Sequence, residues 1–214
     1  RKLDVSTLLD VVRKYADIMM HTMERYFVLE DTMEITDKIA QDVMKNVMKY
    51  AKILKKDPEN YEARAEIMWC GSLSHNGLTG CGTCGGDWAT HLIEHELGGM
   101  FDVAHGAGLA AVWGSWARYV MDEKPERFAQ FAVDVMGVEE SDDVKSTALK
   151  GIEAVEEFYR MIEMPTNMKE LGINPTDEQI KDMAMKATNH DTQQLGAFKK
   201  LSAKDLVEIY KTAK

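Results

Sequence analysis

The sequence predicts an all-α fold, a multi-helix bundle that forms a single domain over residues 1–214. Apolar residues recur at intervals of three and four along most of the chain, which is the spacing of one helix face. No segment shows the apolar and polar alternation of a half-buried strand. The hydrophobic content of 45% is ordinary for a globular protein, and 214 residues are enough to bury a substantial core.

The first three helices are expected at residues 4–28, 37–56 and 59–75. The first is indicated by apolar residues at helical spacing: Leu8, Val11, Val12, Tyr15, Ile18, Met19 and Tyr26. Asp57-Pro58 ends the second, because proline disfavours the helical conformation in the residue before it. The third ends in a glycine-rich loop, "NGLTGCGTCGGD".

The fourth helix is expected to begin at Asp87, which would act as its N-cap, and to carry His91 and His95. Gly98-Gly99 should weaken it, since glycine is unfavourable inside a helix. A fifth helix follows from His105 to about residue 121. The chain can therefore turn after the glycine pair and bring His105 back toward the fourth helix.

The remaining helices are expected at 124–136, 142–163, 176–188 and 202–213. Ser202 and Asp205 resemble a capping box at the start of the last one. Pro165 and Pro175 bracket a short connector, but the apolar positions on either side are too few for two independent cores. One domain is therefore predicted.

The composition argues against several classes of partner. A formal charge of −10 would repel nucleic acid and anionic membrane surfaces, so neither is expected as a partner. The chain has no apolar run long enough to span a membrane and no signal-peptide pattern at its N-terminus. With only three cysteines there is no disulfide framework, which fits a reducing compartment. A soluble cytoplasmic protein is expected.

Histidine spacing indicates a metal site. Residues 91–105 contain three of the six histidines, and His91 and His95 are one helical turn apart. Asp17 and His21 have the same spacing, and Asp17 is the only charge between residues 15 and 23. A lone carboxylate in such an apolar window is costly unless it is paired or binds a cation. One carboxylate with two or three imidazoles suits Zn²⁺ or Fe²⁺. The alternative is that these are satisfied or solvated histidines, with Asp17 and His21 forming a simple hydrogen bond.

Other motifs carry weaker signals. "HLIEH" matches the H-x-x-E-H pattern of zinc peptidases, in which His91 and His95 bind zinc and Glu94 is the general base. "GCGTCG" matches the dinucleotide fingerprint G-x-G-x-x-G, but that motif requires a preceding strand where a helix is predicted here. Its cysteines form an isolated C-x-x-C, interpreted as incidental thiols. His75 and His190 have no partner that the sequence identifies and are interpreted as structural or solvated.

Several stretches together resemble the iron-containing alcohol dehydrogenases, in particular the butanol dehydrogenase branch. They are "ADIMMHTMERYF", "YEARAEIMWCGSLSHNGL", "DWATHLIEHELGGMFDVAHGAGLA", "PERFAQFA" and "LGAFKKLSAKDLVEIY". In that family a C-terminal helical bundle holds one divalent ion through an Asp and three His. The resemblance implies that Asp17, His21, His91 and His105 are the metal ligands. It places His95 in the catalytic cleft as a substrate-side or proton-relay residue.

The resemblance also implies a function. The chain is expected to be the metal-binding catalytic domain of an NAD(P)-dependent alcohol dehydrogenase that interconverts primary alcohols and aldehydes by hydride transfer. The Rossmann-like nucleotide-binding domain of the family has no counterpart in these residues, so the isolated chain is expected to be inactive. A homodimer is expected.

Two alternatives come from different classes of protein. The first is a zinc hydrolase built on His91, Glu94 and His95. The second is a non-enzymatic helical remnant whose exposed apolar surface causes self-association.

Overall fold

A computed structural model of the chain describes residues 5–30 and 33–214, with side chains from residue 14 onward within those ranges. In these residues the secondary structure is helical, and the only β pairing is an isolated bridge between Leu195 and Leu201. The predicted all-α class is therefore confirmed. Residue 4 and the side chains of Leu8, Val11 and Val12, which belong to the first predicted helix, lie outside the described part.

Each of the predicted helices corresponds to one helix of the structure, with ends that differ by a few residues. The α-helices are α1 (Val5–Tyr26), α2 (Glu34–Lys56), α3 (Tyr61–His75), α4 (Ala89–Phe101), α5 (His105–Val120), α6 (Pro125–Asp134), α7 (Val144–Met161), α8 (Asp177–Ala187) and α9 (Ala203–Ala213). Two single-turn 3₁₀ helices, η1 (Leu78–Gly80) and η2 (Met121–Glu123), follow α3 and α5.

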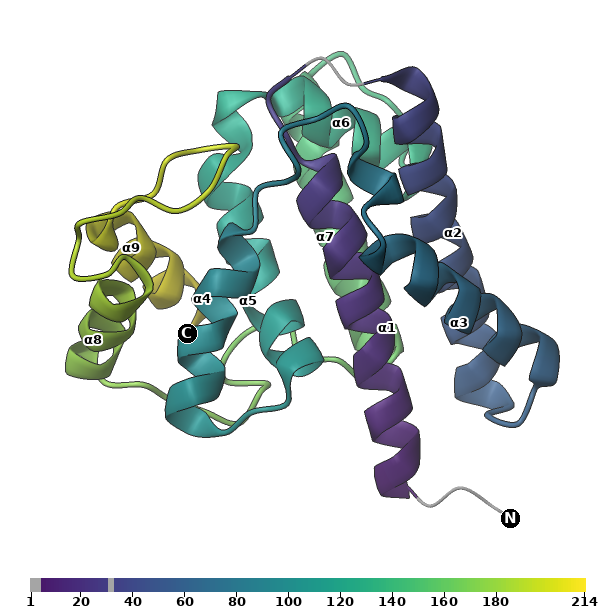
Figure 1. Cartoon of the computed structure of the whole chain (residues 1–214), viewed down its shortest axis with the longest axis horizontal. Helices are drawn as coiled ribbons and strands as arrows, with labels where there is room; N and C mark the ends of the chain where they lie inside the picture. Colours follow the sequence, from purple (N-terminus) through teal and green to yellow (C-terminus); the bar gives the residue numbers. More distant parts are fainter. Residues whose placement is uncertain (1–4, 31–32) are drawn as a thin grey trace.

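Helix α1 runs through the middle of the molecule (Figure 1). It packs against α2 and α3 on one side and against α5 on the other. Helix α4 lies along α5, and the α8–α9 pair covers the outer side of α4 and α5. The α6–α7 hairpin packs on α5 through α7. Helices α1, α3, α4 and α5 therefore meet near the centre of one face.

The core is centred on α5, whose residues 106–117 are all buried. Trp113 and Trp116 are among its largest fully buried side chains. Phe27, just after α1, stacks on Phe128 of α6 with ring centroids 4.4 Å apart. Burial of such aromatic rings contributes strongly to stability. It also fixes the C-terminal end of α1 relative to the later helices.

A buried ion pair ties down the same end of α1. The Arg127 guanidinium donates to both carboxylate oxygens of Asp37 at 2.6 and 2.7 Å, and to the Tyr26 carbonyl oxygen. It also lies over the Tyr26 ring, 3.6 Å from the centroid. A buried charge needs this degree of pairing because its desolvation is costly.

Two predicted helix boundaries need correction. Helix α4 does not weaken at Gly98-Gly99 but continues to Phe101, and the chain turns at Asp102, which has φ of 53°. The N-cap position of α4 is Trp88 and not Asp87. The Asp87 carboxylate still accepts a hydrogen bond from the Ala89 N–H at 3.0 Å, so it caps the first turn from one residue further away. The capping box of Ser202 and Asp205 is confirmed.

Candidate metal centre

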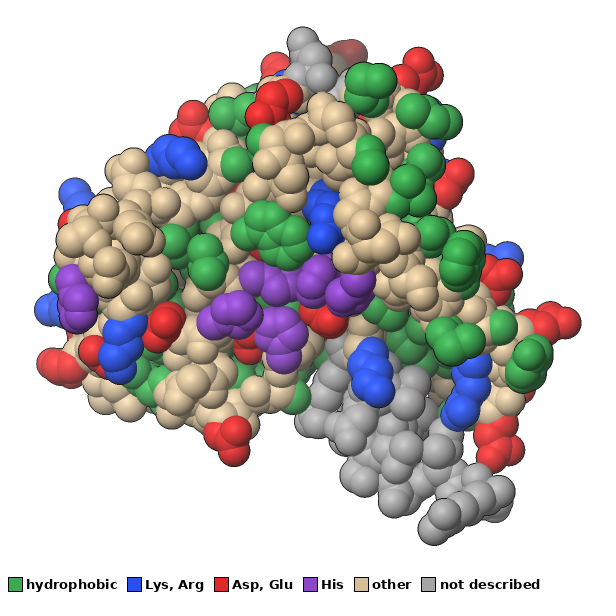
Figure 2. Space-filling model, viewed as in Figure 1, with side chains coloured by type: hydrophobic (Ala, Val, Ile, Leu, Met, Phe, Trp, Pro, Cys, Tyr) green, Lys and Arg blue, Asp and Glu red, His purple; other side chains and the backbone are tan. Residues whose placement is uncertain are grey.

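Five of the six histidines lie side by side with Asp17 on one face of the molecule. Figure 2 shows a continuous row of imidazoles there. Adjacent ring centroids are 3.9 Å apart for His21–His75, 4.5 Å for His21–His91, 5.5 Å for His91–His105 and 5.6 Å for His95–His105. Four helices contribute to this row, namely α1, α3, α4 and α5.

One oxygen of Asp17 lies at the centre of the row. Its Oδ1 is 3.1 Å from His21 Nδ1, 3.4 Å from His105 Nε2 and 3.7 Å from His91 Nε2. Asp17, His21 and His91 each offer a ligand atom, and these atoms lie within 4.8 Å of one another. The structure thus brings together the carboxylate and the three imidazoles that the family resemblance implied as a ligand set.

Two atoms at this point are buried without a hydrogen bond. They are Asp17 Oδ1 and His91 Nε2, which face each other. Buried polar atoms are normally satisfied, and each exception needs a physical explanation. A cation between them would satisfy both atoms. One carboxylate oxygen and three imidazole nitrogens are the donor types that Zn²⁺ and Fe²⁺ take, so these residues fit a divalent ion.

Glu24 orients His91. Its Oε1 accepts hydrogen bonds from the backbone N–H of His91 at 3.0 Å and from His91 Nδ1 at 3.1 Å. Because a carboxylate accepts from Nδ1, the lone pair of the neutral ring is left on Nε2, which faces Asp17. Glu24 was not among the candidate residues that the sequence indicated. It follows Asp17 by seven positions and His21 by three, so its position on their helix face was the available signal.

Glu94 orients His105 in the same way. Its Oε2 contacts His105 Nδ1, and His105 Nε2 therefore points at Asp17. The Glu94 side chain is only 2% exposed and packs against Gly108, where an added Cβ would lie 2.5 Å from Glu94 Oε1. Carboxylate–histidine pairs of this kind fix the ring orientation at metal sites. The H-x-x-E-H interpretation assigned Glu94 a different role, as a general base.

Charge coupling in the cluster shifts the pKa values of its members. Burial would raise the pKa of Asp17, but the adjacent His105, His21 and His91 outweigh it and hold that pKa below the ordinary value. The nearby carboxylates, Asp17 first and then Glu94, raise the pKa of His105 to about 10, against the effect of burial. Burial would lower the pKa of His91, but Asp17 and Glu24 outweigh it and the net shift is upward. In the metal-free chain, these carboxylates therefore favour the protonated forms of His91 and His105.

Asp87 connects this centre to the C-terminal part of the chain. Its Oδ2 accepts from the backbone N–H groups of Ala197 and Phe198, each at 2.7 Å, and its own N–H donates to the Glu24 carbonyl oxygen. Burial and the charge of Glu24 raise the pKa of Asp87 to about 6. The start of α4 is therefore held between α1 and the segment that precedes α9.

The remaining candidate residues lie as follows. The exposed His95 lies at the edge of the row, with its ring centroid 6.4 Å from that of His91. His190 lies away from the cluster, exposed after α8. His75, for which the sequence identified no partner, is half-exposed in the row, and its Nε2 lies 3.4 Å from Asp17 Oδ2. Cys81 and Cys84 are free and exposed, and helix α3 precedes their loop where a dinucleotide fingerprint needs a strand.

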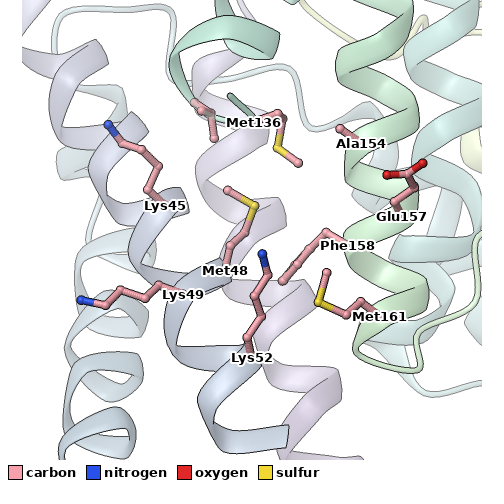
Figure 3. A pocket seen from close by; sticks show the side chains of 10 residues that line it. Lys45, Met48, Lys49, Lys52, Met136, Ala154, Glu157, Phe158 and Met161 are labelled. Carbon is pink, nitrogen blue, oxygen red and sulfur yellow. The ribbon is translucent and has the colours of Figure 1, made fainter. Parts of the chain in front are cut away.

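A separate groove of about 390 Å³ lies between α2 and α7 (Figure 3). Lys45, Lys49 and Lys52 line one side of it, and Phe158 and Met161 line the other. It shares no lining residue with the histidine row.

Within the described residues, no helix is both long and apolar enough to cross a lipid bilayer.

Comparison with known proteins gives a consistent result. Residues 12–214 match the family model described as Fe-containing alcohol dehydrogenase, C-terminal. The chain is 35% identical over 198 residues to the probable NADH-dependent butanol dehydrogenase 1 of Bacillus subtilis, and 32% identical over 197 residues to NADH-dependent butanol dehydrogenase A of Clostridium acetobutylicum. Each match covers 92% of this chain and 50% of the relative. The chain thus spans about half the length of these relatives.

Solved structures show the same likeness. NADH-dependent butanol dehydrogenase A from Thermotoga maritima aligns with a TM-score of 0.86 at 33% identity, over 94% of this chain and 51% of that one. The aldehyde reductase YqhD from Escherichia coli aligns with a TM-score of 0.90 at 28% identity, over 97% of this chain and 53% of that one.

Proposed function

The chain belongs to the Fe-containing alcohol dehydrogenase family, and on that premise we propose that it forms the metal-binding domain of an NAD(P)-dependent alcohol dehydrogenase. Residues 1–214 are assigned to a single domain. Asp17, His21, His91 and His105 are assigned as the ligands of one divalent ion, Zn²⁺ or Fe²⁺. The reaction proposed for the whole protein is the interconversion of a primary alcohol and its aldehyde by hydride transfer.

The main support for this proposal is a pair of buried atoms that have no hydrogen-bond partner, Asp17 Oδ1 and His91 Nε2. They face each other beside two further imidazoles. Burial of these atoms is costly in the absence of a partner. Their supporting carboxylates, Glu24 and Glu94, are themselves buried, which is the arrangement expected around metal-ligating histidines.

The residues of the chain have distinct roles in this proposal. Asp17 and the three histidines hold the ion, and Glu24 and Glu94 keep His91 and His105 aimed at it. A bound divalent ion supplies Lewis-acid polarisation of the substrate oxygen, and a nicotinamide cofactor supplies or accepts the hydride. His95, at the exposed edge of the row, is assigned to the substrate side, where it can exchange a proton with solvent.

The names of the relatives support the proposed substrate class. They include NADH-dependent butanol dehydrogenases and an NADPH-dependent aldehyde reductase, so a small alcohol or aldehyde is proposed as the substrate. Both nicotinamide cofactors occur among them, and the proposal therefore covers NAD and NADP. We also propose that the whole protein is a cytoplasmic homodimer.

The zinc-hydrolase alternative is disfavoured by the position of Glu94. A general base in the H-x-x-E-H arrangement needs a carboxylate oxygen free to take a proton from water. Here Oε2 contacts His105 Nδ1, and Oε1 is enclosed beside Gly98 and Gly108. The observed contacts therefore assign Glu94 to holding His105.

Metal analysis of anaerobically purified protein tests the proposal. Wild type should contain about one Zn²⁺ or Fe²⁺ per chain, and Asp17→Ala and His91→Ala should lose it. His95→Ala should retain the ion, because the proposal does not count His95 as a ligand. His190→Asn, which changes an exposed histidine outside the row, is the matched control. Equal metal content in wild type, Asp17→Ala and His91→Ala would contradict the ligand assignment.

A further inference from the structure

A second groove, here called the α1–α3 groove, lies where α1 and α3 pack against the C-terminal end of α2. Its volume is about 270 Å³, at the small end of the range for small-molecule sites. Its apolar walls are formed by Ile18 of α1, Leu54 of α2, and Ile67 and Met68 of α3. It shares no lining residue with the histidine row or with the groove between α2 and α7.

Two cations line this groove, and no acidic side chain is among the lining residues that the structure describes. They are Lys14 of α1 and Arg64 of α3, both exposed. Arg64 Nε donates to the Pro58 carbonyl oxygen at 2.6 Å, which anchors the guanidinium and leaves its terminal amino groups for a ligand. A guanidinium can hold a carboxylate through two parallel hydrogen bonds. In a chain with a formal charge of −10, this groove is therefore a local site for an anion.

The Tyr15 hydroxyl is the unsatisfied polar group of the groove. Tyr15 lines the groove and is only 2% exposed, and its hydroxyl has no hydrogen-bond partner within the part of the chain that the structure describes. Burial raises the pKa of Tyr15 to about 12 and the charge of Arg64 opposes that rise, so the hydroxyl and the guanidinium are close enough to interact. A buried hydroxyl without a partner is costly, and a ligand oxygen beside Arg64 would accept its hydrogen bond.

We propose that the α1–α3 groove binds a medium-chain aliphatic carboxylate, with the hydrocarbon chain along the apolar walls and the carboxylate held by Arg64 and the Tyr15 hydroxyl. Lys14 adds attraction for the negative charge at the exposed edge of the groove. Small polar anions are disfavoured, because they bury no hydrocarbon against the walls. The inference does not depend on the metal centre and is tested on metal-free protein.

Titration of the EDTA-treated chain with octanoate tests the proposal. Labelling the methionine methyl groups with ¹³C places the ligand, because the NMR signal of Met68, assigned by its absence in Met68→Leu, reports on the groove wall. Octanoate should shift this signal in a saturable way. Affinity should rise about fourfold for each methylene added between hexanoate and octanoate. Octanol and octylamine carry the same chain without a negative charge and should bind at least about tenfold more weakly.

Two variants test the groups assigned to the carboxylate. Tyr15→Phe removes only the hydroxyl and should weaken octanoate binding about tenfold or more, as for a hydrogen bond to a charged group. Its unfolding midpoint without ligand should not fall, since the hydroxyl has no partner to lose. Arg64→Met should weaken binding to a similar extent.

Matched controls remove the same groups elsewhere. Tyr61→Phe changes a tyrosine that is 82% exposed and does not line the groove. Lys52→Met removes one positive charge from the groove between α2 and α7. Both should bind octanoate as wild type does.

Three results would overturn the proposal. The first is a Met68 signal that octanoate does not shift, including the case in which octanoate binds elsewhere on the chain. The second is equal affinity for octanoate and octanol, which would reduce the site to an apolar surface without anion recognition. The third is wild-type octanoate affinity in both Tyr15→Phe and Arg64→Met. Metal content has no bearing on these results, so they are separate from the test of the metal centre.

Discussion

The Glu24 carboxylate accepts two hydrogen bonds from His91, one from its backbone N–H at 3.0 Å and one from Nδ1 at 3.1 Å. A residue of α1 therefore fixes both the first turn of α4 and the orientation of an imidazole on it. Because Asp17 and His21 also lie on α1, this helix supplies two of the assigned ligands and the support of a third.

The first prediction concerns Glu24→Gln. Glutamine keeps the length of the side chain but offers a neutral amide, which holds the Nδ1–H of His91 less strongly than a carboxylate does. Zn²⁺ affinity, measured by competition with a chelator, should fall about 10–100-fold. Glu59→Gln changes an exposed glutamate before α3 and should leave the affinity unchanged. Wild-type affinity in the Glu24 variant would show that His91 needs no carboxylate partner.

The second prediction compares two glycine substitutions. In Gly108→Ala the new Cβ would lie 2.5 Å from Glu94 Oε1 and 2.8 Å from its Cγ, so the Glu94 side chain must shift from the position in which it contacts His105. Overpacking of this kind costs about 1–3 kcal/mol of unfolding free energy, and metal affinity should fall as well. Gly99→Ala has no atom within 4 Å of its Cβ and should instead gain about 0.5–1 kcal/mol, as alanine does inside a helix.

Denaturant unfolding of the metal-free variants measures both effects. The comparison isolates the contact with Glu94, because both substitutions add the same methyl group to a helical glycine. Similar stability changes in the two variants would contradict the packing argument.

The helices and the pairing of Asp17 with His21 were predictable because both depend on local spacing. Periodicity of three and four located α1 to α9, and the four-residue separation of Asp17 from His21 identified one half of the site. Convergence of α1 with α4 and α5 is a property of the packed structure. The sequence pattern could indicate that Asp17 needed a partner, but the family resemblance was required to assign His105.

The misjudged positions depend on contacts between distant residues. Gly98 was expected to weaken α4, yet α4 continues through it, and an added Cβ there would lie 3.1 Å from Glu94 Oε1. Its lack of a side chain leaves room for a buried carboxylate. The sequence identified no partner for His75, because Asp17, which its ring contacts, precedes it by 58 positions. Pairings over such a separation have no local signal.

The third prediction concerns pH and the metal-free chain. Asp17 and Glu94 raise the pKa of His105 from 6.5 to about 10. Above pH 6.5 the unfolded chain has lost this proton while the folded chain keeps it, so the stabilisation from His105 is full below 6.5 and is lost as the pH rises toward about 10. The contribution of Asp17 to stability depends on pH in the opposite direction. Its lowered pKa gives stability above its ordinary value of 3.8 that is lost as the pH falls below it.

The unfolding free energy of EDTA-treated protein should therefore fall as the pH is raised from about 6.5 to about 9, and His105→Gln should fall less over the same interval. Zn²⁺ affinity should change in the other direction. The ion binds only to a neutral His105, so binding below the pKa of His105 must displace a proton. For each proton displaced, Zn²⁺ affinity should rise about tenfold with every pH unit until the pH reaches that pKa. Denaturant titrations and chelator competition at several pH values measure the two trends. An affinity that does not depend on pH, together with equal pH profiles for wild type and His105→Gln, would show that His105 carries no proton that the ion must displace.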